Sequence, residues 1–261
     1  MKHEFKETGK LMIPLNLVII VFTLFGALFL GSRLFENPTM ALMAIICLML
    51  YIFSLIAIFI VAYVYFTVRF YKSMYASQGY LTHTLPLSTG SILNTKVLVS
   101  LFWILVTVLF TFLSVAALIF TAFRQEWGKM FVDIDVSLVQ DSLIGFLIPY
   151  FFLLLVGCLE QILMIYASLS IGQLFRQYRI LASVGMFFAF YAVIQILGTV
   201  TMFITNFFSV NTLFLTPQSG ENTFFSFYRH IFSISAIESI LLCVIFYIVC
   251  YWLTNKKLNL E

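Results

Sequence analysis

Two acidic residues lie inside long apolar stretches of this chain and are its most unusual chemical feature. Glu160 is in the fourth such stretch and Glu238 in the sixth. A charge at membrane depth costs about 3 kcal/mol or more, so such side chains usually face a bundle interior or water. Helical spacing places several neighbours, most of them polar or small, on the same faces. These neighbours are Gly157, Gln161, Met164 and Ser168 around Glu160, and Ser235, Ser239 and Leu242 around Glu238.

Two interpretations of these polar faces stay open. They can line a translocation path, or they can pack helices together through interhelical hydrogen bonds. The candidate path residues are Glu160, Gln161, Gln195 and Glu238. The Ser, Thr and Gly faces, such as Thr107, Thr111 and Ser114, favour packing. The different depths of Glu160 and Glu238 argue against a direct pair within one subunit.

Motifs for catalysis and for metal binding are absent from the sequence. There is no GxxxxGK[ST] loop, HExxH or GxSxG, so the chain cannot hold ATP phosphates by the usual route and does not read as an enzyme. His3, His83 and His230 fall in three different polar segments, which disfavours a metal site. The four cysteines lie in apolar runs and are expected to be free thiols.

The composition predicts the elements that must position these residues. The 261 residues are 62% hydrophobic, 18% aromatic and only 10% charged. A soluble domain carries roughly 25% charged residues, so both a soluble enzyme and a disordered chain are excluded. A net charge of +3 is too small to indicate nucleic acid. The chain is therefore expected to be an all-α, polytopic protein of the lipid bilayer.

Six apolar stretches are each long enough to cross roughly 30 Å of hydrocarbon. No run alternates with the period of two that a membrane barrel needs. We expect one transmembrane domain over 1–261, with spans at about 11–32, 40–68, 97–122, 142–170, 180–205 and 231–254.

The positions of the basic residues predict the orientation. With the N-terminus inside, ten of the 14 Lys and Arg residues fall on the inner side and four on the outer side. The connectors are short, which is the regime in which basic residues mark the cytoplasmic side. Both termini are therefore expected in the cytoplasm.

The connector between the second and third spans is uncharged from Lys72 to Lys96 although it is predicted to be cytoplasmic. Such an aromatic-bearing segment is better explained by a covering protein than by water. Lying on the membrane surface is the other possibility. Pro86 is expected to break the segment, and Ser88 to cap a second short helix leading into Lys96.

The connector 206–229 is rich in aromatic residues, which a water-exposed loop would not carry. Re-entrant or interfacial helices broken near Pro217 and Gly220 would explain them. Ordinary aromatic anchoring at the membrane interface is the competing explanation.

The six spans and the connector text GYLTHTLPLSTGSILNTK together resemble the ABC-2 type transporter permeases. The pieces Gly79–Thr82 and Thr84–Ser88, followed by Leu93 and Lys96, carry the match. The resemblance implies that a separate ATPase subunit docks on 73–87 as a coupling helix, with a lesser contact at Gly172 to Arg179. The implied coupling residues are Met74, Gln78, Gly79, Tyr80, Leu81, His83, Leu85, Pro86, Phe175, Arg176 and Arg179.

The resemblance also implies the assembly. ATP and Mg would bind the partner ATPase, and this chain would hold no cofactor. A second permease copy, most simply a homodimer, would complete twelve spans in a bacterial plasma membrane. The chain is similar to Gram-positive exporters of antimicrobial or amphipathic peptides such as phenol-soluble modulins. The expected function is ATP-driven export of an apolar or amphipathic peptide, drug or lipid.

Two other function classes remain open from the sequence. One is a secondary transporter or channel driven by an ion gradient, with Glu160 or Glu238 carrying protons. The other is a membrane scaffold or sensor that transports nothing. Copurification of an ATPase separates the first function from these two.

Overall fold

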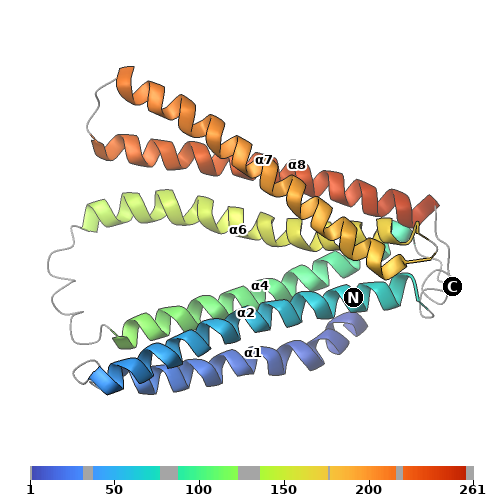
Figure 1. Cartoon of the computed structure of the whole chain (residues 1–261), viewed down its shortest axis with the longest axis horizontal. Helices are drawn as coiled ribbons and strands as arrows, with labels where there is room; N and C mark the ends of the chain where they lie inside the picture. The colour runs from blue at the N-terminus through green and yellow to red at the C-terminus, as the bar shows by residue number, and fades with distance from the viewer. Residues whose placement is uncertain are drawn as a thin grey trace. The chain divides into compact units, whose positions relative to one another are not determined.

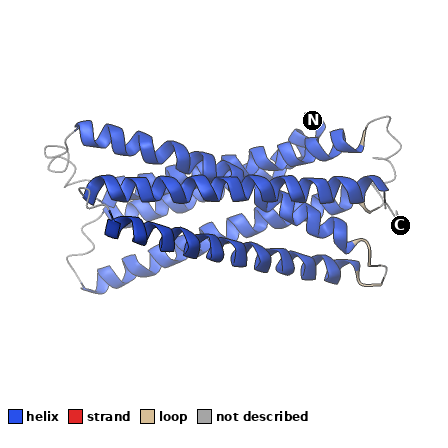
Figure 2. Cartoon of the chain, turned by 90° about the horizontal axis from the view of Figure 1, so that it is seen from above, coloured by secondary structure: helices blue, strands red, loops and turns tan. Residues whose placement is uncertain are grey.

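The computed structural model describes residues 2–31, 38–76, 88–122, 136–175, 177–215 and 220–256. Within these residues the fold is entirely helical and has no strand (Figure 2). The helices are α1 (Lys2–Gly31), α2 (Pro38–Met74), α4 (Thr89–Ala122), α6 (Val136–Gly172), α7 (Arg179–Leu215) and α8 (Gly220–Lys256), labelled in Figure 1.

Each helix contains one of the apolar stretches seen in the sequence. All six are long and apolar enough to cross a membrane, so the chain is a multi-pass membrane protein. The prediction of an all-α protein with six spans is confirmed. The helices exceed the predicted spans because hydropathy marks the part inside hydrocarbon, whereas the backbone hydrogen bonds of a helix continue into the interface. A 37-residue helix such as α2 is about 55 Å long.

The structure divides into two compact units. Unit 1 comprises Met1–Val68 and Leu98–Leu138, and unit 2 comprises Arg69–Val97 and Val139–Glu261. Unit 1 therefore holds α1 and most of α2 and α4. Unit 2 holds the last residues of α2, the first residues of α4, all of α6 after Leu138, and α7 and α8.

Ser88 caps a helix as predicted, but the helix is not a separate short one. The Ser88 hydroxyl accepts a hydrogen bond from the Ser91 backbone N–H at 3.3 Å, which satisfies one of the free donors of a helix N-terminus. From Thr89 the helix runs without a break to Ala122. The boundary expected near Lys96 was wrong, because the side chain of Lys96 is buried and the helix backbone continues past it.

The helix ends bear on the prediction for 206–229. α7 continues to Leu215 and α8 begins at Gly220, so the two helices end and begin beside Pro217 and Gly220, where a break was predicted. α7 contains no proline, and Pro217 lies just beyond its last residue, where a helix is expected to end. The re-entrant and the interfacial explanation of this region both stay predictions.

In unit 1, α1 and α4 run parallel in tight contact. Gly9 lies against the Trp103 ring, and Gly26 lies against Leu118, where an added Cβ would approach the side chain to 3.0 Å. Trp103 Nε1 donates a hydrogen bond of 2.9 Å to Thr8 Oγ1. Glycines that admit a neighbouring side chain are the usual device for close helix packing in a membrane.

In unit 2, α6 is the most enclosed helix and α7 the least. Within its apolar stretch α6 has 33% of its residues buried, whereas α7 has 6%. α7 packs against α8, where the rings of Phe190 and Phe246 lie 5.1 Å apart. The polar residues singled out on α6 are therefore placed in the interior of this unit.

Candidate functional site

Glu160 is the buried acidic residue of unit 2. Its side chain on α6 is only 6% exposed. The Ser239 hydroxyl of α8 hydrogen-bonds it, and Glu238 is near enough to interact with it electrostatically. The two glutamates therefore lie in the same region of unit 2. The expectation that they form no direct pair stays a prediction.

The other two candidate path residues have different surroundings. Gln161 is half-buried beside Glu160 on α6, and Gln195 is exposed on α7. Gly198 and Gly157 have no atom within 4 Å of where a Cβ would stand. The structure therefore joins Glu160, Gln161 and Glu238 in one region of unit 2 and leaves Gln195 on the outside of its helix.

The hydroxyl face of α4 joins helices to one another. Ser114 Oγ lies 2.6 Å from Thr23 Oγ1 of α1 and also hydrogen-bonds the Tyr51 hydroxyl of α2. The hydroxyls of Thr107 and Thr111 donate to carbonyls of their own helix. These contacts match the packing interpretation of this face, in which buried hydroxyls bridge helices that have no water to bind.

A second polar cluster lies where α2 ends. Tyr75 is the first residue after α2 and is only 4% exposed. Its hydroxyl donates to Ser170 Oγ of α6 at 2.8 Å and lies 3.5 Å from Thr254 Oγ1 of α8. Cys250 Sγ lies 3.3 Å from Ser170 Oγ and completes the cluster. We call Tyr75, Ser170, Cys250 and Thr254 the Tyr75 cluster.

Burial governs the protonation of this tyrosine. Desolvation raises the pKa of Tyr75 to about 12 from an ordinary value of 10.0. The phenol therefore keeps its proton throughout the physiological range and remains a hydrogen-bond donor.

Aromatic packing holds the end of α2 against α6 at the same place. The Phe70 ring stacks on the Tyr166 ring with a centroid distance of 3.9 Å and an interplanar angle of 8°. Phe70 also meets Tyr75 edge to face at 6.0 Å. Met74 is fully buried here, so a coupling role for it would act through packing.

Sequence reasoning missed the Tyr75 cluster, although one signal pointed to it. The second, fourth and sixth spans end on the same side of the membrane in any six-span topology. Tyr75, Ser170 and Thr254 all lie near those ends. Three hydroxyl side chains at one level are candidates for contact, but one sequence does not say which faces meet.

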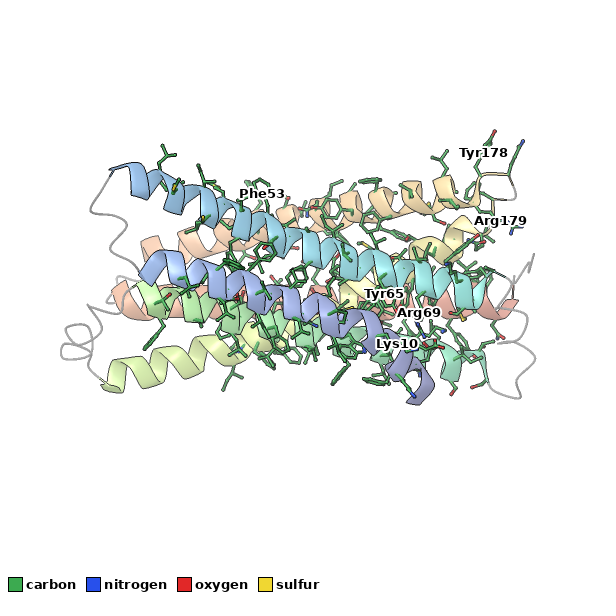
Figure 3. The ribbon with its side chains drawn as sticks, turned by 90° about the horizontal axis from the view of Figure 1, so that it is seen from below. Lys10, Phe53, Tyr65, Arg69, Tyr178 and Arg179 are labelled. Carbon is green, nitrogen blue, oxygen red and sulfur yellow. The ribbon has the colours of Figure 1, made fainter. Side chains whose placement is uncertain are left out.

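The connection between α6 and α7 is tightly constrained at its base and exposed at its tip. A Cβ on Gly172 would lie 2.7 Å from Ser183 Cα, so only glycine allows α6 to approach α7 this closely. Beyond it, Phe175 is 52% and Tyr178 is 64% exposed. Figure 3 shows Tyr178 directed away from the helices, with Arg179 beside it at the start of α7.

Most of the predicted coupling residues lie outside the described residues. This holds for Gln78, Gly79, Tyr80, Leu81, His83, Leu85 and Pro86, and for Arg176 in the second contact. Among the residues that the structure does describe, no three His, Cys, Asp or Glu side chains come together in a way that could hold a metal ion.

Comparison of the chain with protein-family models, curated proteins and solved structures gives no match. Its identity therefore rests on its own residues and geometry. Six apolar helices make it a multi-pass membrane protein.

Proposed function

We propose that the chain is the permease subunit of an ATP-driven ABC exporter. In this proposal a separate ATPase binds ATP and Mg, docks on residues 73–87 with a lesser contact at Gly172 to Arg179, and drives export. The exported substrate is an apolar or amphipathic peptide, drug or lipid. The charge distribution supports a cytoplasmic position for both termini and both docking segments.

One structural observation supports the proposal in addition to the connector sequence. Both segments implied as ATPase contacts belong to unit 2, since it contains residues 69–97 and the α6–α7 connection. The tip of that connection exposes Leu174, Phe175 and Tyr178. If this tip lies in the cytoplasm, two aromatic rings there favour burial under a protein partner.

A second copy of the chain belongs to the same proposal. Six spans with no nucleotide site form half of a twelve-span exporter, and the simplest assembly is a homodimer in a bacterial plasma membrane. α7 leaves most of its surface open to a partner or to lipid.

Affinity purification of the tagged chain from its native membrane tests the function. We expect an ATPase subunit to copurify and its ATP hydrolysis to rise when the two are reconstituted in vesicles. Phe175→Asp should reduce the copurified ATPase about tenfold or more, because it places an unpaired carboxylate in the contact. Phe175→Leu keeps an apolar side chain and should behave like wild type. If no ATPase accompanies the wild-type chain, the proposal fails.

An ion-driven transporter is the second candidate, and Glu160 favours it. A buried acid close to Glu238 and hydrogen-bonded to Ser239 has the arrangement of an intramembrane proton site. This candidate predicts transport by the purified chain alone, driven by a pH gradient across vesicles. Transport that requires both ATP and the ATPase would exclude it.

A further inference from the structure

The connector between α2 and α4 is attached to the rest of unit 2 at its first residue. The Tyr75 backbone N–H donates to the Tyr71 carbonyl at 2.9 Å, so the backbone of Tyr75 is still hydrogen-bonded to the last turn of α2. Its side chain enters unit 2 and its hydroxyl reaches both α6 and α8. A displacement of the connector therefore acts first on this side chain.

The Tyr75 hydroxyl has one proton to donate and two possible acceptors, the hydroxyl oxygens of Ser170 and Thr254. The Ser170 hydroxyl donates its proton to the Tyr166 carbonyl at 2.8 Å, and the Thr254 hydroxyl donates to the Cys250 carbonyl at 2.6 Å. Both hydroxyl oxygens are left as acceptors for the same phenol. The phenol is close to Ser170 and farther from Thr254, which makes the bond to α6 the stronger one in this conformation.

Packing makes this arrangement stiff. The Phe70–Tyr166 stack fixes the last turn of α2 on α6, one turn before Tyr75. The ring of Tyr75 leans on Phe70, so its hydroxyl has little freedom to move independently of the helix end. The Tyr75 hydroxyl is held rigidly and has two alternative acceptors, Ser170 on α6 and Thr254 on α8. Movement of one helix can therefore be transmitted to the other when the hydroxyl changes its acceptor.

We propose that Tyr75 is the positioning residue that transmits movement of the connector to α6 and α8, by passing its hydrogen bond from Ser170 to Thr254. This inference rests on the proposed function, because the movement comes from an ATPase docked on the connector. The Tyr75 cluster links the connector to the fourth and the sixth spans, including the helix that carries Glu160.

Tyr75→Phe tests the proposal with the ring retained. Tyr51→Phe is the matched control, because Tyr51 is also buried and hydrogen-bonds a serine hydroxyl, but in unit 1. Both variants should insert and elute like wild type. We expect Tyr75→Phe to keep the copurified ATPase and its ATP hydrolysis but to lower transport per ATP about fivefold, a typical effect of one hydrogen bond. Tyr51→Phe should leave transport per ATP unchanged.

Variants of the acceptors add readouts that a purely structural role would not change. Ser170→Thr keeps the hydroxyl and should retain coupling, whereas Ser170→Ala should lower it. In a Tyr75→Phe background, Ser170→Ala should cost nothing more, because the two residues act through one bond. Full additivity of the two losses would overturn the proposal, as would unchanged transport per ATP in Tyr75→Phe.

Cys250 provides a test that needs no ATPase. A chain carrying Cys47→Ala, Cys158→Ala and Cys243→Ala keeps only this thiol, which is fully buried in the cluster. The rate of its modification by N-ethylmaleimide reports how often the cluster opens. We expect Tyr75→Phe to raise this rate severalfold and Tyr51→Phe to leave it unchanged. Equal modification rates in the parent chain, Tyr75→Phe and Tyr51→Phe would overturn the proposed role of Tyr75 even if the ATPase docks. Failure of the ATPase to copurify would overturn the proposed function, but it would not change what the modification rates say about Tyr75.

Discussion

At the scale of single residues, Glu160 is a buried acidic side chain in the described part of the chain. Its carboxyl group lies on α6, and the Ser239 hydroxyl of α8 hydrogen-bonds it. A membrane protein that only needed packing at this place would be served by a leucine. We propose this acid as a site for interaction with a substrate or ion, because acidic residues within membrane spans usually have a function.

Glu160→Gln tests the substrate path. If the carboxyl group lines the path, its removal should weaken export of a cationic peptide by about tenfold while export of a matched neutral peptide changes little. Transport normalised to inserted protein measures both. Ser239→Ala is the control, because it removes the hydrogen bond and keeps the charge. An equal fall for both peptides would assign Glu160 to packing.

Tyr75 provides a pH signature at the same scale. An unfolded tyrosine loses its proton near pH 10, whereas the folded pKa of Tyr75 is about 12. Stability from this group is thus fully present below pH 10 and is lost as the pH rises towards 12. The loss amounts to about 2–3 kcal/mol. Chemical unfolding in detergent should show Tyr75→Phe as the less stable chain at pH 8 and the more stable one near pH 12. If the stabilities of wild type and Tyr75→Phe differ by the same amount at every pH, the phenol of Tyr75 is not buried in the folded chain.

At the scale of helices, the sequence predicts how many there are better than where they end. Six apolar runs identify the six helices because crossing hydrocarbon demands about 20 apolar residues. The ends are set by capping and by the interface, as at Ser88, where eight residues of helix precede the predicted third span. The number of apolar residues in a run does not predict where such polar helix ends lie.

The candidate sites were predictable to different degrees for the same reason. Glu160 was visible because an acid in an apolar run is conspicuous in one helix alone. The Tyr75 cluster needs the register of three helices that are far apart in sequence, and helical periodicity gives a face but not its partner. The approach of Glu160 to Ser239 was hidden for that reason as well.

Gly172 shows how one residue sets the approach of two helices. Gly172→Ala would drive a methyl group into the backbone of Ser183 at the start of α7, so α7 must shift. We expect a loss of about 1–3 kcal/mol in stability. Gly157→Ala on the same helix meets no atom within 4 Å and should be neutral or stabilising by about 0.5–1 kcal/mol. The free energy of unfolding of the two variants in detergent measures both effects. Equal free energies would contradict the claim that only glycine fits at position 172.

At the scale of the whole molecule, the distribution of basic residues predicts how the chain sits in the membrane. In the predicted topology, ten of the 14 lie on the side of the α6–α7 connection. A cysteine at Gln177 in a chain without its native cysteines should resist an impermeant thiol reagent added to intact cells. A cysteine at Gln125 should react with it. The reverse labelling would place the proposed docking segments outside and exclude the exporter function.

The hydrogen bond between Glu160 and Ser239 also carries a timing consequence for synthesis. Ser239 is made about 80 residues after Glu160, which at roughly 5–20 residues per second is a delay of about 4–16 seconds. During that interval α6 is in or near the membrane without the helix that satisfies its acid. The nascent chain must hold Glu160 protonated, in the insertion machinery, or at the interface until α8 arrives. α7, which needs little from its neighbours, can enter the lipid first.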